Sequence, residues 1–121
     1  MKYMLLIHEN PDTRKIFFSE EGKALMAQMD ALVQELTESG ELIGGEALAD
    51  PSQTRTVRIR DGGPAVTDGP LAEAKEHFGG YMLLDCESAE RAVEIAMRMP
   101  VAGSGGAMEI RPLMSQSGTE M

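Results

Sequence analysis

The sequence of 121 residues has one cysteine and no long apolar run. A lone cysteine cannot form an intramolecular disulfide or build a thiolate metal site by itself. Asp85 and Glu87 flank Cys86 and disfavour its thiolate, so we expect a half-buried structural thiol rather than a nucleophile. The apolar stretch at residues 3–7 is too short to span a bilayer, and no basic segment with a cleavage site precedes it. A cytoplasmic protein of one domain is therefore expected.

Basic residues are also scarce, because 11 lysines and arginines stand against 20 acidic residues and give a net charge of −9. Binding to nucleic acid requires a basic footprint, and binding to an anionic membrane requires the same sign of charge. Neither partner is expected. Arg55, Arg58 and Arg60 form one local basic segment. This segment fits a polar strand face and an anion-binding role about equally well.

The only two histidines are His8 and His77. Neither has a histidine or cysteine at the spacing of a metal-binding helix, and scattered carboxylates are a weak signal. We therefore expect no metal and no cofactor. His8 stands at the end of an apolar strand, where a hydrogen-bonded structural role is the commoner one.

Periodicity predicts an alternation of strands and helices along the chain. Residues 1–8 are expected to form a strand that is apolar on both faces, and residues 19–40 a helix with an apolar stripe. A strand at 41–49 contains Gly44-Gly45, which predicts a bulge or a close approach of the backbone, and a bulge there would aim Glu46 inward. Further expected elements are a hairpin at 54–67, a strand at 81–85, a helix that begins at Ser88, and a strand at 107–112.

This order predicts an α+β fold of the ferredoxin-like βαββαβ type with an extra hairpin strand. Residues 1–114 would form the single domain, and residues 115–121 a flexible C-terminal tail. Two helices cover only one face of such a sheet. The apolar second face of the first strand then needs another chain, which predicts a homodimer.

The segment from residue 66 to residue 81 joins two predicted strands and is rich in titratable groups. Asp68 suits a turn or a helix cap, Gly69 allows unusual backbone angles, and Pro70 suits a first helical turn. A short helical turn over residues 71–77 would place Glu73, Glu76 and His77 on one side, and Gly79-Gly80 would end it. A capped and solvated connector without chemistry is the alternative reading of the same residues.

Six segments resemble one known family. They are MKYMLLI (1–7), LIGGEAL (42–48), TVR (56–58), TDGPLAEAKE (67–76), GGY (79–81) and EIRP (109–112). Over nearly its whole length the chain is similar to the YCII-related proteins of the DGPF subgroup. It departs from the subgroup motif at Leu71, where phenylalanine is usual.

The resemblance implies a dimeric α+β barrel, a bacterial and cytoplasmic protein, and a cleft lined partly by the motif. Relatives in the wider YCII group, one of them a dehydrochlorinase, use a histidine–aspartate pair on small molecules. The corresponding stretches here offer Lys23 and Glu38 but no histidine, so that mechanism is not carried over. Some DGPF proteins are encoded beside or fused to extracytoplasmic-type sigma factors. Since this chain lacks a helix-turn-helix and a basic surface, it would be at most a partner of such a factor.

Three functions follow as hypotheses: an enzyme that transfers protons on a small organic molecule, a ligand-binding or regulatory module, and a purely structural role for the motif. In the enzyme hypothesis Asp68 is the general base, with His77 as the reserve base or acid. Arg58 or Lys75 would hold an anionic group of the substrate. The remaining expected substrate contacts are Glu46, Glu73 and Tyr81.

Overall fold

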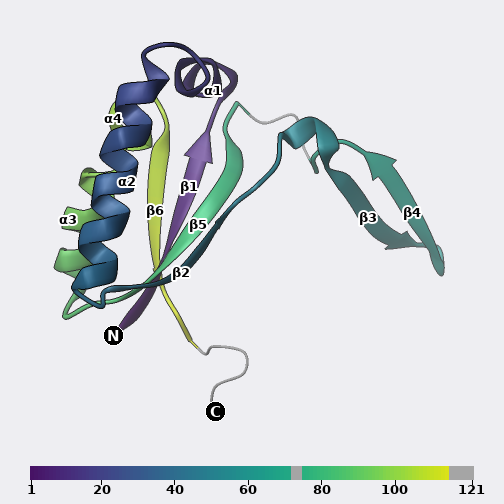
Figure 1. Cartoon of the computed structure of the whole chain (residues 1–121). Helices are drawn as coiled ribbons and strands as arrows, with labels where there is room; N and C mark the ends of the chain where they lie inside the picture. Colours follow the sequence, from purple (N-terminus) through teal and green to yellow (C-terminus); the bar gives the residue numbers. More distant parts are fainter. Residues whose placement is uncertain (72–74, 115–121) are drawn as a thin grey trace.

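The computed structural model describes residues 1–71 and 75–114. A body of helices packed on a sheet makes up most of the chain, and a two-stranded hairpin stands away from it (Figure 1). In chain order the elements are β1 (Lys2–Glu9), α1 (Pro11–Phe17), α2 (Gly22–Glu38), β2 (Leu42–Ala47), the 3-10 helix η1 (Pro51–Gln53), β3 (Arg55–Arg60), β4 (Gly63–Asp68), β5 (His77–Asp85), α3 (Ala89–Met97), α4 (Pro100–Gly103) and β6 (Ala107–Pro112). The expected tail at 115–121 lies outside the described residues. Among the described ranges, no helix is long and apolar enough to cross a membrane.

Four strands form an antiparallel sheet in the order β2-β5-β1-β6. With the hairpin and the short helices set aside, the chain follows the βαββαβ order of the ferredoxin-like fold. The predicted α+β class is confirmed. The hairpin, however, is not an extra strand of this sheet, because β3 and β4 pair with each other in a separate sheet.

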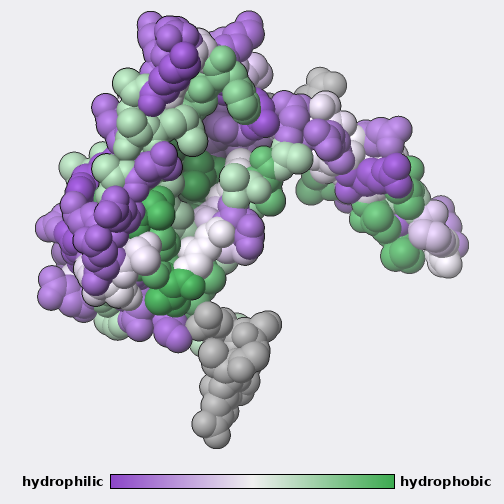
Figure 2. Space-filling model, in the orientation of Figure 1, coloured by the Kyte–Doolittle hydropathy of each residue, from purple (hydrophilic) through white to green (hydrophobic). Residues whose placement is uncertain are grey.

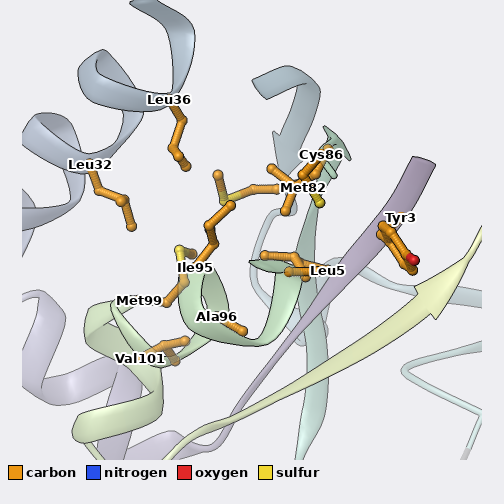
Figure 3. Close-up of a cluster of buried hydrophobic side chains, with 12 residues drawn as sticks. Tyr3, Leu5, Leu32, Leu36, Met82, Cys86, Ile95, Ala96, Met99 and Val101 are labelled. Atoms are coloured by element: carbon orange, nitrogen blue, oxygen red, sulfur yellow. The ribbon is translucent and has the colours of Figure 1, made fainter. Parts of the chain in front are cut away.

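The hydrophobic core lies between the sheet and the layer formed by α2 and α3 (Figure 3). Its largest fully buried apolar side chains are Leu5 and Leu84 from the strands, and Leu36 and Ile95 from the helices. Cys86 is buried at the edge of this core, and its thiol donates a hydrogen bond to the carbonyl of Ser88 at 3.4 Å. The expected structural role of the thiol is confirmed.

Polar side chains set the starts of two helices. The Asn10 side chain accepts a hydrogen bond from the Thr13 N–H at 2.9 Å, and α1 begins where only a turn and an ambiguous stretch were expected. Ser88 caps α3 as predicted, since its hydroxyl oxygen accepts from the Arg91 N–H at 3.1 Å. Ser19 does not cap the long helix. Its hydroxyl donates to the Ile16 carbonyl instead, and α2 begins at Gly22 without a side-chain cap.

None of the described helices lies on the second face of the sheet (Figure 1). The register pairs Met4 with Leu83 and Leu6 with Tyr81, so these four side chains share the face opposite the helices. We call this surface the open face. The alternation that the sequence predicted for β1 therefore leaves an apolar surface that the described part of the chain does not cover with a second layer.

We call residues 55–68, which comprise β3, β4 and their turn, the arm. The register pairs Val57 with Val66 and Ile59 with Pro64, so these side chains share one face of the arm. Val57, Ile59 and Val66 are 61%, 70% and 60% exposed, which shows that the described residues do not bury that face.

The connector between the arm and β5 differs from the expected helical turn. The backbone N–H of Gly69 donates to Thr54 at 2.7 Å, and the Thr56 hydroxyl donates to Gly69 at 2.9 Å, so the motif closes the base of the arm. The turn predicted for residues 71–77 fails at its end, because β5 already begins at His77. Residues 72–74, and Glu73 with them, lie outside the described residues. Gly80 continues β5 instead of ending a helix, since a Cβ there would lie 2.6 Å from the Glu46 carbonyl.

Candidate functional site

A cavity of about 550 Å³ lies between α2 and the β2 side of the sheet, and residues from α1, α4, β1 and β5 complete its lining. We call it the α2–β2 cavity. Its wall is mainly apolar, and Figure 2 shows apolar surface between the helical layer and the sheet. The apolar side chains at its wall include Ile7, Phe17, Met29, Val33, Met82 and Val101.

Glycines keep part of this wall free of side chains. Gly44, Gly45 and Gly79 all line the cavity. The register of β2 on β5 shifts between Leu42 and Gly44, which confirms the bulge expected at the double glycine. A Cβ at Gly45 would lie 2.8 Å from the Tyr81 carbonyl, so the close pairing of β2 and β5 requires glycine there.

Three polar residues belong to the lining of the same cavity: Glu9, Glu46 and Tyr81. Glu9 is held by Arg14, whose Nη1 lies 2.5 Å from Glu9 Oε1. Glu46 and Tyr81 stand opposite each other across the β2–β5 pair, and the register places both side chains on the face of the sheet opposite the helices. Glu46 is exposed, so the expected inward orientation of its carboxylate is wrong. Neither of these two side chains forms a hydrogen bond or ion pair within the described ranges. They are thus polar groups beside the cavity, at the edge strand β2, that remain available to a bound molecule.

A second cavity of about 470 Å³ lies at the start of α1, beside η1. Arg14 contacts two other residues of its lining. Its Nε lies 3.1 Å from Asp50 Oδ1, and its guanidinium carbon lies 5.3 Å from the centre of the Phe18 ring. Hydrogen bonds from Ser52, followed by the charges of Arg14 and His77, hold the pKa of Asp50 below its usual range. Since Arg14 already faces two carboxylates, this cavity does not favour an anionic ligand.

The expected site residues are divided among three places. Glu46 and Tyr81 line the α2–β2 cavity, and His77 lines the second cavity. Asp68, Arg58 and Lys75 are exposed and line neither of these two cavities. Asp68 ends β4 at the base of the arm, and its carboxylate makes no hydrogen bond to the described residues. Glu73 lies outside the described residues. The described titratable groups of the motif therefore do not converge on one of these two cavities.

The sequence reasoning missed the pairing of Glu9 with Arg14. A signal was present, because Glu9 continues the alternation of Tyr3, Leu5 and Ile7 on the apolar helix-facing side of β1. An acidic residue on that face requires a partner, and α1 supplies it.

His8 takes the hydrogen-bonded role that was expected of it. Its Nε2 lies 2.5 Å from Glu109 Oε1, and its ring meets the Phe78 ring edge-on, with 6.0 Å between the centres. Both contacts lie away from the two cavities. In the part of the chain that the structure describes, no three His, Cys, Asp or Glu side chains are grouped so that they could hold a metal ion.

Comparisons with known proteins agree with this fold. The model of the YCII-related domain matches residues 1–117. An uncharacterized protein of Rhizobium meliloti (strain 1021) is 32% identical over 114 residues, which cover 93% of this chain and 92% of that protein. Among solved structures, 5-chloro-2-hydroxyhydroquinone dehydrochlorinase from Burkholderia phenoliruptrix AC1100, in complex with 2,5-dihydroxybenzoquinone, aligns with a TM-score of 0.56 at 11% identity. The alignment covers 99% of this chain and 100% of that one, and at this identity it indicates a shared fold.

Proposed function

The chain belongs to the YCII-related domain family, and on that premise we propose that it binds a small, largely apolar organic molecule in the α2–β2 cavity and catalyses a proton transfer on it. The observation that carries this proposal is an apolar cavity of about 550 Å³ whose lining includes two polar residues, Glu46 and Tyr81, whose side chains have no partner among the described residues. Sites for small molecules typically combine an apolar wall with a few polar groups that fix orientation.

Glu46 is the proposed proton acceptor and Tyr81 the proposed hydrogen-bond donor. Both would act on the part of the ligand that extends from the cavity past the edge strand β2, to the face on which the register places their side chains. A carboxylate without a partner can take a proton from a carbon or hydroxyl of the ligand. The electron pair left behind moves onto a ligand oxygen, where the Tyr81 hydroxyl would stabilise the developing charge. Glu9 is already bound by Arg14, so its role would be to shape the cavity rather than to accept the proton.

Asp68 and His77 remain the second choice for the base and the acid. The carboxylate of Asp68 is exposed at the base of the arm, so it would act only on a molecule that another chain helps to cover. The same condition applies to an anion held by Arg58 or Lys75. Glu46 is preferred because it belongs to the lining of a cavity within its own chain.

Hydroxylated aromatic and quinone compounds are the ligand class to test first. The structurally similar dehydrochlorinase is named for a chlorinated hydroxyhydroquinone and is bound to a dihydroxybenzoquinone. Such rings offer an apolar surface for the wall of the cavity and hydroxyl groups for Glu46 and Tyr81. A flat ring would also suit a wall that is partly glycine backbone.

Two copies are proposed to pair through their open faces. Met4, Leu6 and Leu83 form an apolar centre on a sheet face without helices, and soluble monomers rarely leave such a surface uncovered. A sigma factor, the alternative partner raised by the resemblance, gains no support from the matched relatives. Pairing of identical chains is the simpler way to cover the face.

The test is a ligand-observed NMR screen of hydroxylated aromatic and quinone compounds, run on wild type and on two phenylalanine variants. Val33→Phe fills the cavity from α2 and should abolish binding, because Val33 lines the wall. Gln34→Phe is the matched control, since the next residue of α2 is exposed and lies outside the lining. Compounds that bind all three proteins equally would refute the cavity as the site.

Catalysis is tested separately with Glu46→Gln, which keeps the shape of the side chain and removes its basicity. Any compound that binds wild type is followed for conversion, or for exchange of a ring proton with solvent deuterium. Glu46→Gln should bind the compound and fail to convert it, while Glu38→Gln at the exposed end of α2 should behave as wild type. Conversion at the wild-type rate by Glu46→Gln would remove Glu46 as the base. Binding without conversion or exchange in wild type would leave a non-catalytic binding module.

A further inference from the structure

The arm lacks the packing that a two-stranded hairpin needs. An isolated hairpin is marginally stable in water and normally gains stability from a third strand or a packed layer. Val57, Ile59 and Val66 on one face of the arm are each at least 60% exposed, and among the described strands β3 and β4 pair only with each other. Burial of these apolar side chains would therefore have to come from residues other than those described in this chain.

A hollow separates the arm from the body. The arm stands off the side of the sheet that carries no helices (Figure 1). Figure 2 shows that apolar atoms of the arm gather on the side turned toward this hollow. The hollow is therefore bounded by the open face on one side and by the apolar face of the arm on the other. A molecule that fills the hollow must therefore have apolar surface on the two sides that contact the open face and the arm.

A second copy of the chain has both surfaces. If two open faces meet about a twofold axis, the arm of each copy extends over the body of the other. Each arm then covers the partner, and the same contact is made twice. Each copy supplies both surfaces that this isologous contact needs, namely the open face and the apolar face of the arm.

The charges also favour a copy of this chain. The arm carries Arg55, Arg58 and Arg60 against two aspartates, while the whole chain has a net charge of −9. Within the described ranges none of these three arginines forms a salt bridge. Two bodies of the same negative sign repel each other. Arg58 and Arg60 lie on the face of the arm opposite Val57, so they make no direct contact with the partner in this arrangement, but three arginines against two aspartates give the arm one net positive charge, which reduces the repulsion from an acidic partner.

We propose that the arm is a clasp, which packs its Val57, Ile59 and Val66 face against the body of a second copy seated in the hollow. The inference rests on the pairing of open faces included in the proposed function, and it adds a second contact to it. The two sets of contacts, face on face and arm on body, would together hold the dimer.

The test places a photo-reactive benzoylphenylalanine at position 57, on the apolar face, and as a control at position 67, on the opposite face of the same hairpin. Chains labelled with ¹⁴N and ¹⁵N are mixed, irradiated and analysed by mass spectrometry, so that links between chains carry both isotopes. Position 57 should link to body peptides of the other copy, and position 67 should give at least ~5-fold less of this product.

Equilibrium sedimentation of charge variants is the second measurement. Val57→Glu should weaken dimerisation at least ~10-fold, and Thr67→Glu should change it less than ~3-fold, since only the first residue lies on the apolar face. Circular dichroism confirms that both variants keep the body folded.

The possible results separate the clasp from the rest of the account. A wild-type dimer whose position 57 links only within its own chain, or only to the arm of the partner, overturns the clasp and leaves the pairing of open faces. A wild-type chain that stays monomeric overturns both contacts. Binding of ligand in the α2–β2 cavity is measured independently by the NMR screen, so failure of the clasp and failure of the proposed ligand site are distinguishable.

Discussion

The body and the arm contain the same types of apolar residue in different surroundings. Ile95 in the body is 0% exposed and Val101 is 5% exposed, whereas Ile59 and Val57 in the arm are 70% and 61% exposed. Both regions follow local rules of secondary structure, since the strands of each alternate their side chains across two faces. The difference lies in what packs on those faces. The body supplies its own second layer through α2 and α3, and the arm has none in a single chain. Stability should therefore reside in the body, and sensitivity to a partner in the arm.

The largest expected effect is loss of stability from a cavity in the core. Leu36→Ala should lower the free energy of unfolding by about 2–5 kcal/mol, because Leu36 is fully buried between α2 and the sheet. Val57→Ala in the arm should cost less than ~0.5 kcal/mol at concentrations where the chain is monomeric. Urea denaturation followed by circular dichroism measures both. Equal losses of unfolding free energy for the two variants would contradict the claim that stability resides in the body rather than in the arm.

The next effect concerns the ion pair between Glu41, at the start of the β2 region, and Arg91 on α3. Arg91 Nε and Nη2 lie 2.8 Å and 2.9 Å from the Glu41 carboxylate oxygens. Arg91→Met should cost about 2 kcal/mol near pH 7, because these charge-assisted hydrogen bonds are partly shielded from water. The exposed pair of Arg98 with Glu35 is the control, and Arg98→Met should cost less.

The same pair gives a dependence on pH. The hydrogen bonds from Arg91 hold the pKa of Glu41 below its usual range in the folded state. A lowered folded pKa contributes stability above the unfolded pKa of about 4.3, and this contribution is lost as the pH falls through the folded pKa. Unfolding free energies measured from about pH 6 down to about pH 3 should therefore converge for wild type and Arg91→Met. A constant difference across this range would contradict the assignment.

A smaller effect is expected at the start of α3. Ser88→Ala removes the acceptor of the Arg91 N–H and should cost about 1 kcal/mol. Ser88→Asp should retain most of that stability, because aspartate is an equally good cap. Thermal unfolding of the three proteins decides whether the cap or the side-chain volume matters.

The smallest effect is expected at the motif. Asp68→Asn should change the free energy of unfolding by less than ~0.5 kcal/mol, since the Asp68 carboxylate makes no hydrogen bond within the described residues. Asp50→Asn is the control and should have a larger effect, because the Asp50 side chain accepts from Ser52 and pairs with Arg14. A large loss of stability in Asp68→Asn would mean that the base of the arm is held more firmly than this geometry allows.

Much of the fold could be predicted from the sequence, because local signals and the global arrangement agree in the body. The last strand was expected at residues 107–112, where β6 is found, and Ser88 begins its helix as a side-chain cap would require. The alternation of side chains in β1 also predicted two apolar faces. In the structure one of them packs against the helices and the other belongs to the open face.

The structure differs from the prediction where the secondary structure of a segment depends on contacts with residues far away in the sequence. Gly79-Gly80 has the local look of a helix end, but the close approach of the Glu46 carbonyl to Gly80 makes the pair part of β5. Nothing in the local sequence of the arm indicates that it leaves the sheet. Pairing between strands depends on which other strands are free, which residue patterns alone do not specify.

The candidate site was predictable in part for the same reason. The double glycine pointed to a bulge beside Glu46, and Glu46 and Tyr81 do line one cavity. The density of titratable groups in the connector pointed to Asp68 instead, which lies outside both described cavities. The clustering of titratable residues along the sequence indicated the connector as the site. The position of the cavity depends instead on how α2, β2 and β5 pack, which the sequence pattern does not show.

The most direct test of the central claim uses the methionines of the chain as reporters. Met29, Met82 and Met99 line the α2–β2 cavity, whereas Met4 lies on the open face and Met97 is exposed on α3. Methyl-¹³C methionine spectra are recorded while a hydroxylated aromatic or quinone compound that binds is added. Binding in the cavity predicts that the signals of Met29, Met82 and Met99 shift together while Met97 stays in place. Saturable shifts confined to Met4 or to other methionines outside the cavity would contradict the account.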